Sequence, residues 1–156
     1  MPPEERHGSD ESFSPEDETQ ILDAIGRWLE RDVKDKVMAL ERADEYPHEM
    51  VAQMIEFGLF GATIAREYGG LGLPTPTYAK IVTMISEVWM SLTGIFNSHL
   101  IMSAAVERFG TAEQKARFLP RFASAEMRGG LALTEPDCGT DLQAIRTKAV
   151  LQGESY

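Results

Sequence analysis

The sequence has few of the residues that build metal centres, covalent cross-links or nucleic-acid surfaces. Its single cysteine excludes an internal disulfide, and its three histidines lie too far apart in the chain to predict a local metal site. Lysine and arginine number 15 against 25 aspartates and glutamates, a formal net charge of -10. Nucleic-acid binding is therefore not expected, because phosphate contacts need clustered basic residues. We expect no metal, and a reducing, cytoplasmic setting.

The sequence also lacks a basic N-terminal region followed by an apolar core, so no secretory signal is visible. One stretch without charge, Val88 to Val106, is long enough to be weighed as a membrane span. Serine, threonine, glycine, asparagine and histidine side chains make it too polar for that role. We therefore predict a pair of buried core helices here and no membrane span.

Residues 1–13 are rich in proline, glutamate and serine and have almost no apolar side chains, which predicts a disordered acidic tail. From residue 14 to residue 126, apolar side chains recur mostly at helical spacing, which predicts an α-helical domain. The first helix is predicted to begin at an N-cap, Ser14, and the second to end before Pro47. A third helix is predicted from His48 to Gly58, and a long helix from Thr77 with a break near Gly94 and Asn97 and an end at Gly110. A capping box that pairs Thr111 with Gln114 predicts the start of the last helix.

Two features inside this helical region have a functional and a structural interpretation. The glycine-rich loop at residues 68–74 could cradle a phosphate, but its spacing fits neither the dinucleotide nor the P-loop pattern, so we predict a tight turn between helices. His99 lies in an apolar stretch, where a lone histidine is usually a core residue with one satisfied hydrogen bond.

The rest of the chain is organised around residues 131–141, Leu-Ala-Leu-Thr-Glu-Pro-Asp-Cys-Gly-Thr-Asp. The first three residues are apolar enough for a short buried strand, and proline, aspartate and glycine then form a turn. Such a turn exposes backbone N–H groups and the hydroxyls of Thr134 and Thr140, a surface suited to an anionic or carbonyl-rich ligand. After Ala144 the apolar residues alternate, which predicts a second strand with a turn at Gly153.

These residues resemble the signature of the acyl-CoA dehydrogenase family. The positions that match it are Ala132, Leu133, Thr134, Glu135, Gly139, Thr140, Asp141 and Ala144. Cys138 departs from the signature, because the family normally carries Ala, Gly, Ser or Asn there. The Tyr-Gly-Gly-x-Gly loop at residues 68–72 and the run from Phe109 to Pro120 also resemble the family.

The resemblance covers residues 14–156 and implies a mainly α fold: the N-terminal helical domain of an acyl-CoA dehydrogenase over 14–126 and the first strands of a middle β domain over 127–156. It implies FAD as the cofactor, an acyl-CoA thioester as the substrate, an electron-transfer flavoprotein as the electron acceptor, and a homotetramer. The flavin-contacting residues that it implies are Leu131, Ala132, Leu133, Thr134, Gly139 and Thr140. Thr134 would lie beside the flavin ring, and Thr140 near the phosphates of the flavin or of the thioester substrate.

The catalytic carboxylate of the family comes from a C-terminal helical domain, so the resemblance implies no catalytic residue in this chain. Glu135 is better interpreted as a structural acceptor in the turn. At 156 residues the chain is too short for the whole family fold, so we expect an N-terminal fragment that is inactive alone. The alternative is a non-catalytic helical binding or assembly module that keeps the family fold.

Overall fold

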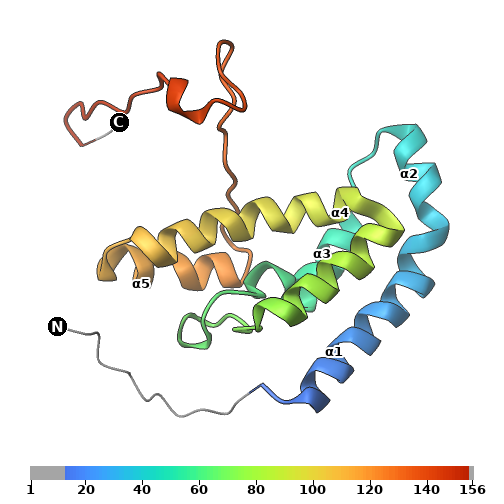
Figure 1. The fold of residues 1–156 in the computed structure, drawn as a ribbon. Coiled ribbons are helices and arrows are strands. Elements are labelled where there is room, and N and C mark those ends of the chain that lie inside the picture. Colours follow the sequence, from blue (N-terminus) through green and yellow to red (C-terminus); the bar gives the residue numbers. More distant parts are fainter. Residues whose placement is uncertain (1–12, 155–156) are drawn as a thin grey trace.

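The computed structural model describes residues 13–154, which are mainly α-helical (Figure 1). Helix α1 (Pro15–Trp28) begins at Ser14, whose hydroxyl accepts from the amide of Asp17 at 3.1 Å, while the Asp17 carboxylate accepts from the amide of Ser14 at 3.0 Å. This capping box confirms the predicted start of the helix. The predicted acidic tail lies outside the described residues, except for Phe13, which packs against the core.

The chain stays helical after α1, through a π-helical turn (Leu29–Val33) and a 3-10 turn (Lys34–Lys36), into α2 (Val37–Ala43). Figure 1 shows these elements following one another along one side of the molecule. Their inward stripe is buried as the spacing predicted, through Ile25, Trp28, Leu29 and Val33. The indole N–H of Trp28 donates to Gln53 at 2.8 Å and so ties α1 to α3 (His48–Glu56).

Backbone hydrogen bonds within the connection from α3 to α4 fold it into a compact loop. It contains 3-10 turns at Leu59–Gly61 and Arg66–Tyr68. The Leu71 amide donates to the Gly61 carbonyl at 2.9 Å, and the Leu73 amide donates to the Ala62 carbonyl at 2.8 Å. A Cβ added at Gly70 would lie 2.1 Å from the Ile64 carbonyl oxygen, so only glycine fits there. The glycine-rich loop is thus the predicted tight turn between helices.

Helix α4 (Thr75–Phe109) bends sharply at Trp89, whose φ of -158° and ψ of 102° are not helical. The predicted break near Gly94 and Asn97 is wrong, because both residues lie inside the helix. Tertiary contacts explain the position of the bend: the indole of Trp89 is only 7% exposed, and its N–H donates to the Glu41 carboxylate of α2. The side chain of Asn97 instead accepts from the Tyr78 hydroxyl within α4.

Helix α5 (Ala112–Ala123) begins with the predicted capping box: the Gln114 amide donates to the Thr111 hydroxyl at 3.2 Å, and the Gln114 side chain accepts from the Thr111 amide at 2.9 Å. It packs against α4 (Figure 1). By length and composition α4 could cross a membrane, but a single such helix is weak evidence, because the core helix of a bundle meets the same test. The apolar side chains that α4 buries here belong to the core shared with α1, α3 and α5.

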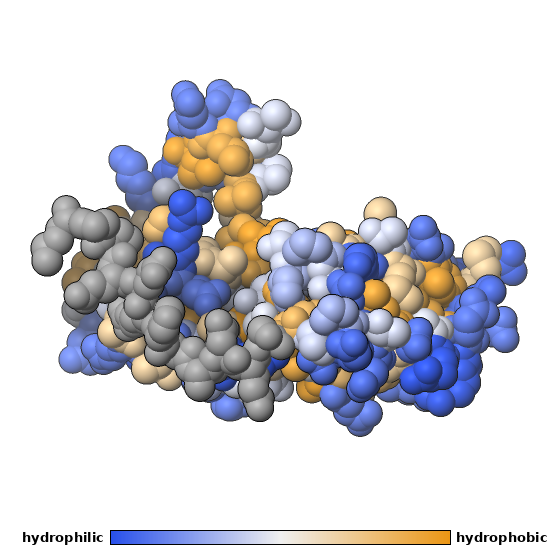
Figure 2. Space-filling model, turned by 60° about the horizontal axis from the view of Figure 1, so that its bottom comes forward, coloured by the Kyte–Doolittle hydropathy of each residue, from blue (hydrophilic) through white to orange (hydrophobic). Residues whose placement is uncertain are grey.

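Beyond α5 the expected strands do not form, and the residues that the structure describes contain no β-strand. The segments predicted as strands, 131–133 and 145–151, are extended and exposed, and an isolated antiparallel bridge joins Glu135 to Cys138. The physical reason is that a strand needs a neighbour to pair its backbone groups. Figure 2 shows hydrophobic side chains on the surface of this projecting part. The exposed apolar residues of the segment include Leu131, Leu133, Leu142, Val150 and Leu151.

Candidate functional site

The segment that carries the predicted flavin contacts projects away from the helices (Figure 1). Within the described chain, the amides of Leu131, Ala132, Leu133 and Thr134 have no hydrogen-bond acceptor. The hydroxyls of Thr134 and Thr140 likewise have no partner there, and both side chains are exposed. The segment therefore offers a row of free donors, which suits a ligand rich in carbonyl or phosphate oxygens.

A short turn holds the two halves of this segment together. The Glu135 amide donates to the Cys138 carbonyl at 2.9 Å, and the Cys138 amide donates back to the Glu135 carbonyl at 3.2 Å. This pair of bonds closes the turn, so Thr134 and Gly139 are the residues just before and just after it. Cys138 is 6% exposed, so it occupies a packing position.

The Glu135 carboxylate organises the chain that follows the turn. Its oxygens accept from the Arg146 amide at 3.0 Å and the Thr147 amide at 2.8 Å. Hydrogen bonding with Thr147, and then with the Arg146 amide, holds the pKa of Glu135 below its ordinary value of 4.5. Glu135 is thus the structural acceptor that the sequence predicted, and each of its two carboxylate oxygens accepts a backbone hydrogen bond.

The start of the next turn is fixed by Asp141, whose side chain accepts from the Gln143 amide at 3.2 Å. A single 3-10 turn, Leu142–Ala144, follows. The structure therefore places Gly139 and Thr140 between two hydrogen-bonded turns, with Thr140 exposed. Leu131, Ala132 and Leu133 lie on the other side of the first turn, in extended backbone.

His99 connects this segment to the helices. It is buried in α4 at 1% exposure, and its ring lies between those of Phe60 and Phe122, at centroid distances of 5.4 and 5.6 Å. Its Nε2 lies 3.1 Å from the Phe122 carbonyl oxygen, and its Nδ1 lies 3.3 Å from the Gly129 amide. The prediction that His99 is a hydrogen-bonded core residue is confirmed, although one hydrogen bond was expected and the ring makes two.

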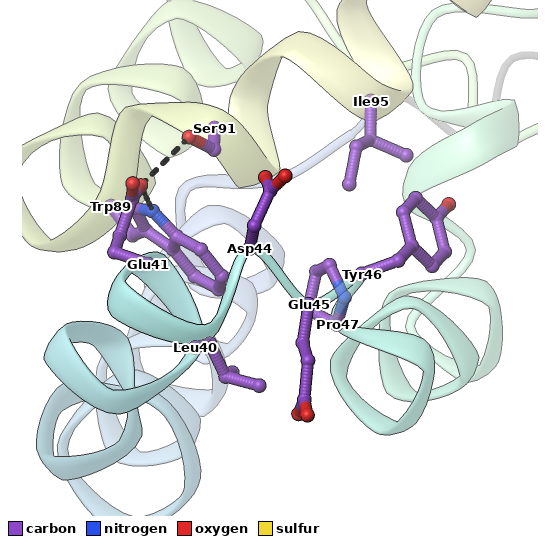
Figure 3. A pocket seen from close by; sticks show the side chains of 9 residues that line it. All are labelled: Leu40, Glu41, Asp44, Glu45, Tyr46, Pro47, Trp89, Ser91 and Ile95. Carbon is purple, nitrogen blue, oxygen red and sulfur yellow. Dashed lines mark hydrogen bonds between the residues drawn. The ribbon is translucent and has the colours of Figure 1, made fainter.

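Sequence reasoning missed the cavity beside the bend of α4 (Figure 3). This cavity has a volume of about 330 Å³ and is lined by Leu40, Glu41, Asp44, Glu45, Tyr46, Pro47, Trp89, Ser91 and Ile95. Glu41 accepts from the Trp89 indole and, at 3.2 Å, from the Ser91 hydroxyl. The two contacts join residues 48 and 50 positions apart, so no local pattern could have revealed the cavity.

A second cavity, of about 350 Å³, is mostly apolar and lies between the end of α4 and α5. Met102, Phe109 and Phe118 are among its lining residues. Phe109, the last residue of α4, is 79% exposed. The helices therefore leave an apolar face open near this end of α4.

Comparison with known proteins defines the class of this fold. The family model for the acyl-CoA dehydrogenase N-terminal domain matches residues 15–126. The chain is 32% identical over 137 residues to the short-chain-specific acyl-CoA dehydrogenase of Clostridium acetobutylicum. That match covers 87% of this chain and 36% of the relative, so the chain spans little more than a third of its length.

Two solved structures extend this comparison. One, described as the electron transferring flavoprotein of Acidaminococcus fermentans, matches with a TM-score of 0.81 and 30% identity, over 92% of this chain and 38% of that chain. The other, an acyl-CoA dehydrogenase from Bacillus anthracis complexed with FAD, matches with a TM-score of 0.71 and 31% identity, over 83% of this chain and 24% of that chain. This chain belongs to the acyl-CoA dehydrogenase family, through its N-terminal helical domain.

Proposed function

We propose that this chain supplies the N-terminal part of an FAD-dependent acyl-CoA dehydrogenase, and that residues 131–134, 139 and 140 contact the flavin. One observation carries the proposal: the amides from Leu131 to Thr134 and the hydroxyls of Thr134 and Thr140 are exposed and unpaired within the described chain. A flavin ring presents carbonyl oxygens and its nucleotide part presents phosphates, so this donor set fits the cofactor. Similarity to a dehydrogenase complexed with FAD supports the same assignment.

In this proposal the chain binds and orients, and FAD, when bound, supplies the hydride acceptor for dehydrogenation of an acyl-CoA between its α and β carbons. Thr134 donates at the ring, and Thr140 donates to the phosphates of the flavin or of the thioester substrate. Glu135 does not serve as the base that removes the α-proton, because the backbone amides of Arg146 and Thr147 occupy its carboxylate. The base comes from outside residues 1–156.

Two partners follow from this assignment. An electron-transfer flavoprotein would accept the electrons, as membership of the acyl-CoA dehydrogenase family implies. A homotetramer would cover apolar surface that the described residues leave open, including Phe109 at the end of α4. We place the assembled protein in the cytoplasm.

The binding half of the proposal is tested by adding excess FAD to the isotope-labelled 156-residue polypeptide and recording amide shifts by NMR. We expect weak binding, with shifts confined to residues 131–140. Thr134→Val should reduce those shifts, whereas Thr83→Val, an equal change on the exposed surface of α4, should not. Shifts elsewhere, or none, would favour the non-catalytic helical module.

The catalytic half is tested by an assay of acyl-CoA-dependent reduction of a dye acceptor, with the same polypeptide and added FAD. We expect no turnover, because in this proposal the base is not supplied by the chain, and Glu135, the carboxylate of the described segment nearest the predicted flavin contacts, is hydrogen-bonded to two backbone amides. Reproducible turnover that Glu135→Gln abolishes would contradict the role given to Glu135. Intact mass must first confirm that the polypeptide ends at Tyr156.

A further inference from the structure

The hydrogen bonds of His99 define a single form of its ring. The Phe122 carbonyl oxygen can only accept and the Gly129 amide can only donate, so these two contacts together favour a proton on Nε2 and a bare Nδ1. Both contacts are satisfied by the same neutral tautomer. A ring protonated on both nitrogens would place an N–H group at Nδ1 against the N–H group of Gly129.

Hydrogen bonds of residues 127, 128 and 129 hold the chain against the helical domain between α5 and the projecting segment. The Met127 amide donates to the Arg121 carbonyl at 3.0 Å, the Arg128 guanidinium donates to the Tyr46 hydroxyl at 3.2 Å, and the Gly129 amide donates to His99 at 3.3 Å. After Gly129, no hydrogen bond between residues 130–154 and the helices occurs within the described chain. The hydrogen bond to His99 is thus the last one between the chain and the helices before Leu131.

Gly129 lies against the side chain of Met102 on α4. A Cβ added at Gly129 would lie 2.5 Å from the terminal carbon of Met102, one turn of α4 beyond His99. The backbone therefore passes directly over α4 at the point where His99 accepts its amide. One residue, Gly130, then separates this contact from the first predicted flavin-contacting residue.

We propose that His99 is a positioning residue, which fixes the point and direction at which residues 131–140 leave the helical domain. That this positioning aids flavin binding rests on the function proposed above, whereas the hydrogen bond between His99 and Gly129 does not. A buried leucine would fill the same space, so a histidine at this position is explained by its two directed bonds.

The hydrogen bond between His99 and Gly129 depends on pH. Burial lowers the pKa of His99 below its ordinary value of 6.5, and the backbone contacts with Phe122 and Phe60 oppose this shift only in part. Arg128, the charged group that acts on the ring within the described chain, lowers the pKa further. His99 is therefore neutral at pH 7, and the bond to Gly129 is lost only as the pH falls through this lowered pKa.

The first experiment needs no substitution. Nitrogen NMR of the histidine rings in the 156-residue chain at pH 7 should report His99 as neutral, with its proton on Nε2. On acidification, the Gly129 amide shift should change together with the His99 ring shifts. A proton on Nδ1 at pH 7, or a Gly129 amide that ignores the ring, would overturn the proposal.

The second experiment separates the two bonds with matched variants. His99→Asn places an amide oxygen near the position of Nδ1, His99→Gln places an amide group near the position of Nε2, and His99→Leu has neither. Hydrogen exchange of the Gly129 amide should become about five- to tenfold faster in the Leu and Gln variants, the factor expected for one lost hydrogen bond, and stay near wild type in the Asn variant. Equal exchange in all three would refute the positioning role.

Ser103→Ala is the control, because it removes another buried hydrogen bond of α4, at 2.8 Å to the His99 carbonyl, and leaves Gly129 untouched. Amides of α1 report whether each variant keeps the fold. The FAD titration is then repeated with the Leu variant. If FAD does not change the amide shifts of residues 131–140 in the wild type but Gly129 exchanges as predicted in the variants, the proposed function fails and the positioning role of His99 stands. If FAD changes those shifts but Gly129 does not exchange as predicted, only the positioning role fails.

Discussion

Gly70 and Gly69 are neighbours in the loop before α4, yet alanine should affect them very differently. At Gly69 the φ of +82° is left-handed, and an added Cβ meets no atom within 4 Å. The cost of Gly69→Ala is therefore the left-handed backbone penalty alone, ~1 kcal/mol. At Gly70 an added Cβ would lie 2.1 Å from the Ile64 carbonyl oxygen, whereas ordinary contact begins at 3.4 Å. The loop would have to retreat by the difference, 1.3 Å.

That retreat is opposed by the bonds that hold the loop, from Leu71 to Gly61 at 2.9 Å and from Gly72 to Ile64 at 2.9 Å. Overpacking costs ~1–3 kcal/mol, and each weakened hydrogen bond ~1 kcal/mol, so we expect Gly70→Ala to cost ~3 kcal/mol. In a domain of this size these costs correspond to a fall in Tm of roughly 10 °C for Gly70→Ala and roughly 3 °C for Gly69→Ala. Thermal unfolding followed by circular dichroism measures both. Equal losses, or a Gly70→Ala variant as stable as wild type, would refute this account of the loop.

Three further predictions concern the projecting segment. Thr134→Val should weaken flavin binding by ~1 kcal/mol, measured by titration in a flavin-bound assembly, because it removes one hydroxyl donor and keeps the shape; an unchanged affinity would contradict the flavin role. Cys138→Ser should leave activity and fold intact in that assembly, since the thiol fills space; a covalent adduct at Cys138, found by mass spectrometry, would show instead that it is a nucleophile. Because the pKa of Glu135 is lowered, its bonds to the Arg146 and Thr147 amides should be fully present above pH 4.5 and be lost as the pH falls through the lowered value. Amide shifts of both residues measure this loss, and Glu135→Gln, which cannot titrate, should remove the pH dependence.

Local patterns predicted the helix starts well. The capping boxes at Ser14 and Thr111 each use residues three apart, so the sequence contains the whole interaction. The bend at Trp89 depends on Glu41, 48 positions away, and glycine content alone pointed to the wrong residue. Periodicity likewise identified the apolar faces of α4 but not what covers them, so Phe109 is exposed.

Flavin contact by residues 131–140 stays a prediction, and the motif could not predict the backbone state of this segment. The motif located the donors of 131–140, yet the strand predicted for Leu131–Leu133 does not form, since its formation depends on another strand alongside it. The hydrogen bond between His99 and Gly129 spans 30 positions and depends on how α4 and α5 pack, so spacing could suggest a core histidine and nothing more.

The unpaired amides from Leu131 to Thr134 also matter for any copy of the protein in which nothing yet covers this stretch, such as a chain still being synthesised. Exposed leucines beside free backbone donors are the features that proteases and chaperones recognise in unfolded chains. While nothing pairs with this stretch, the helical domain can be native and the molecule can still be treated as a folding intermediate. Its lifetime should then depend on how soon this stretch is covered, more than on the stability of its helices.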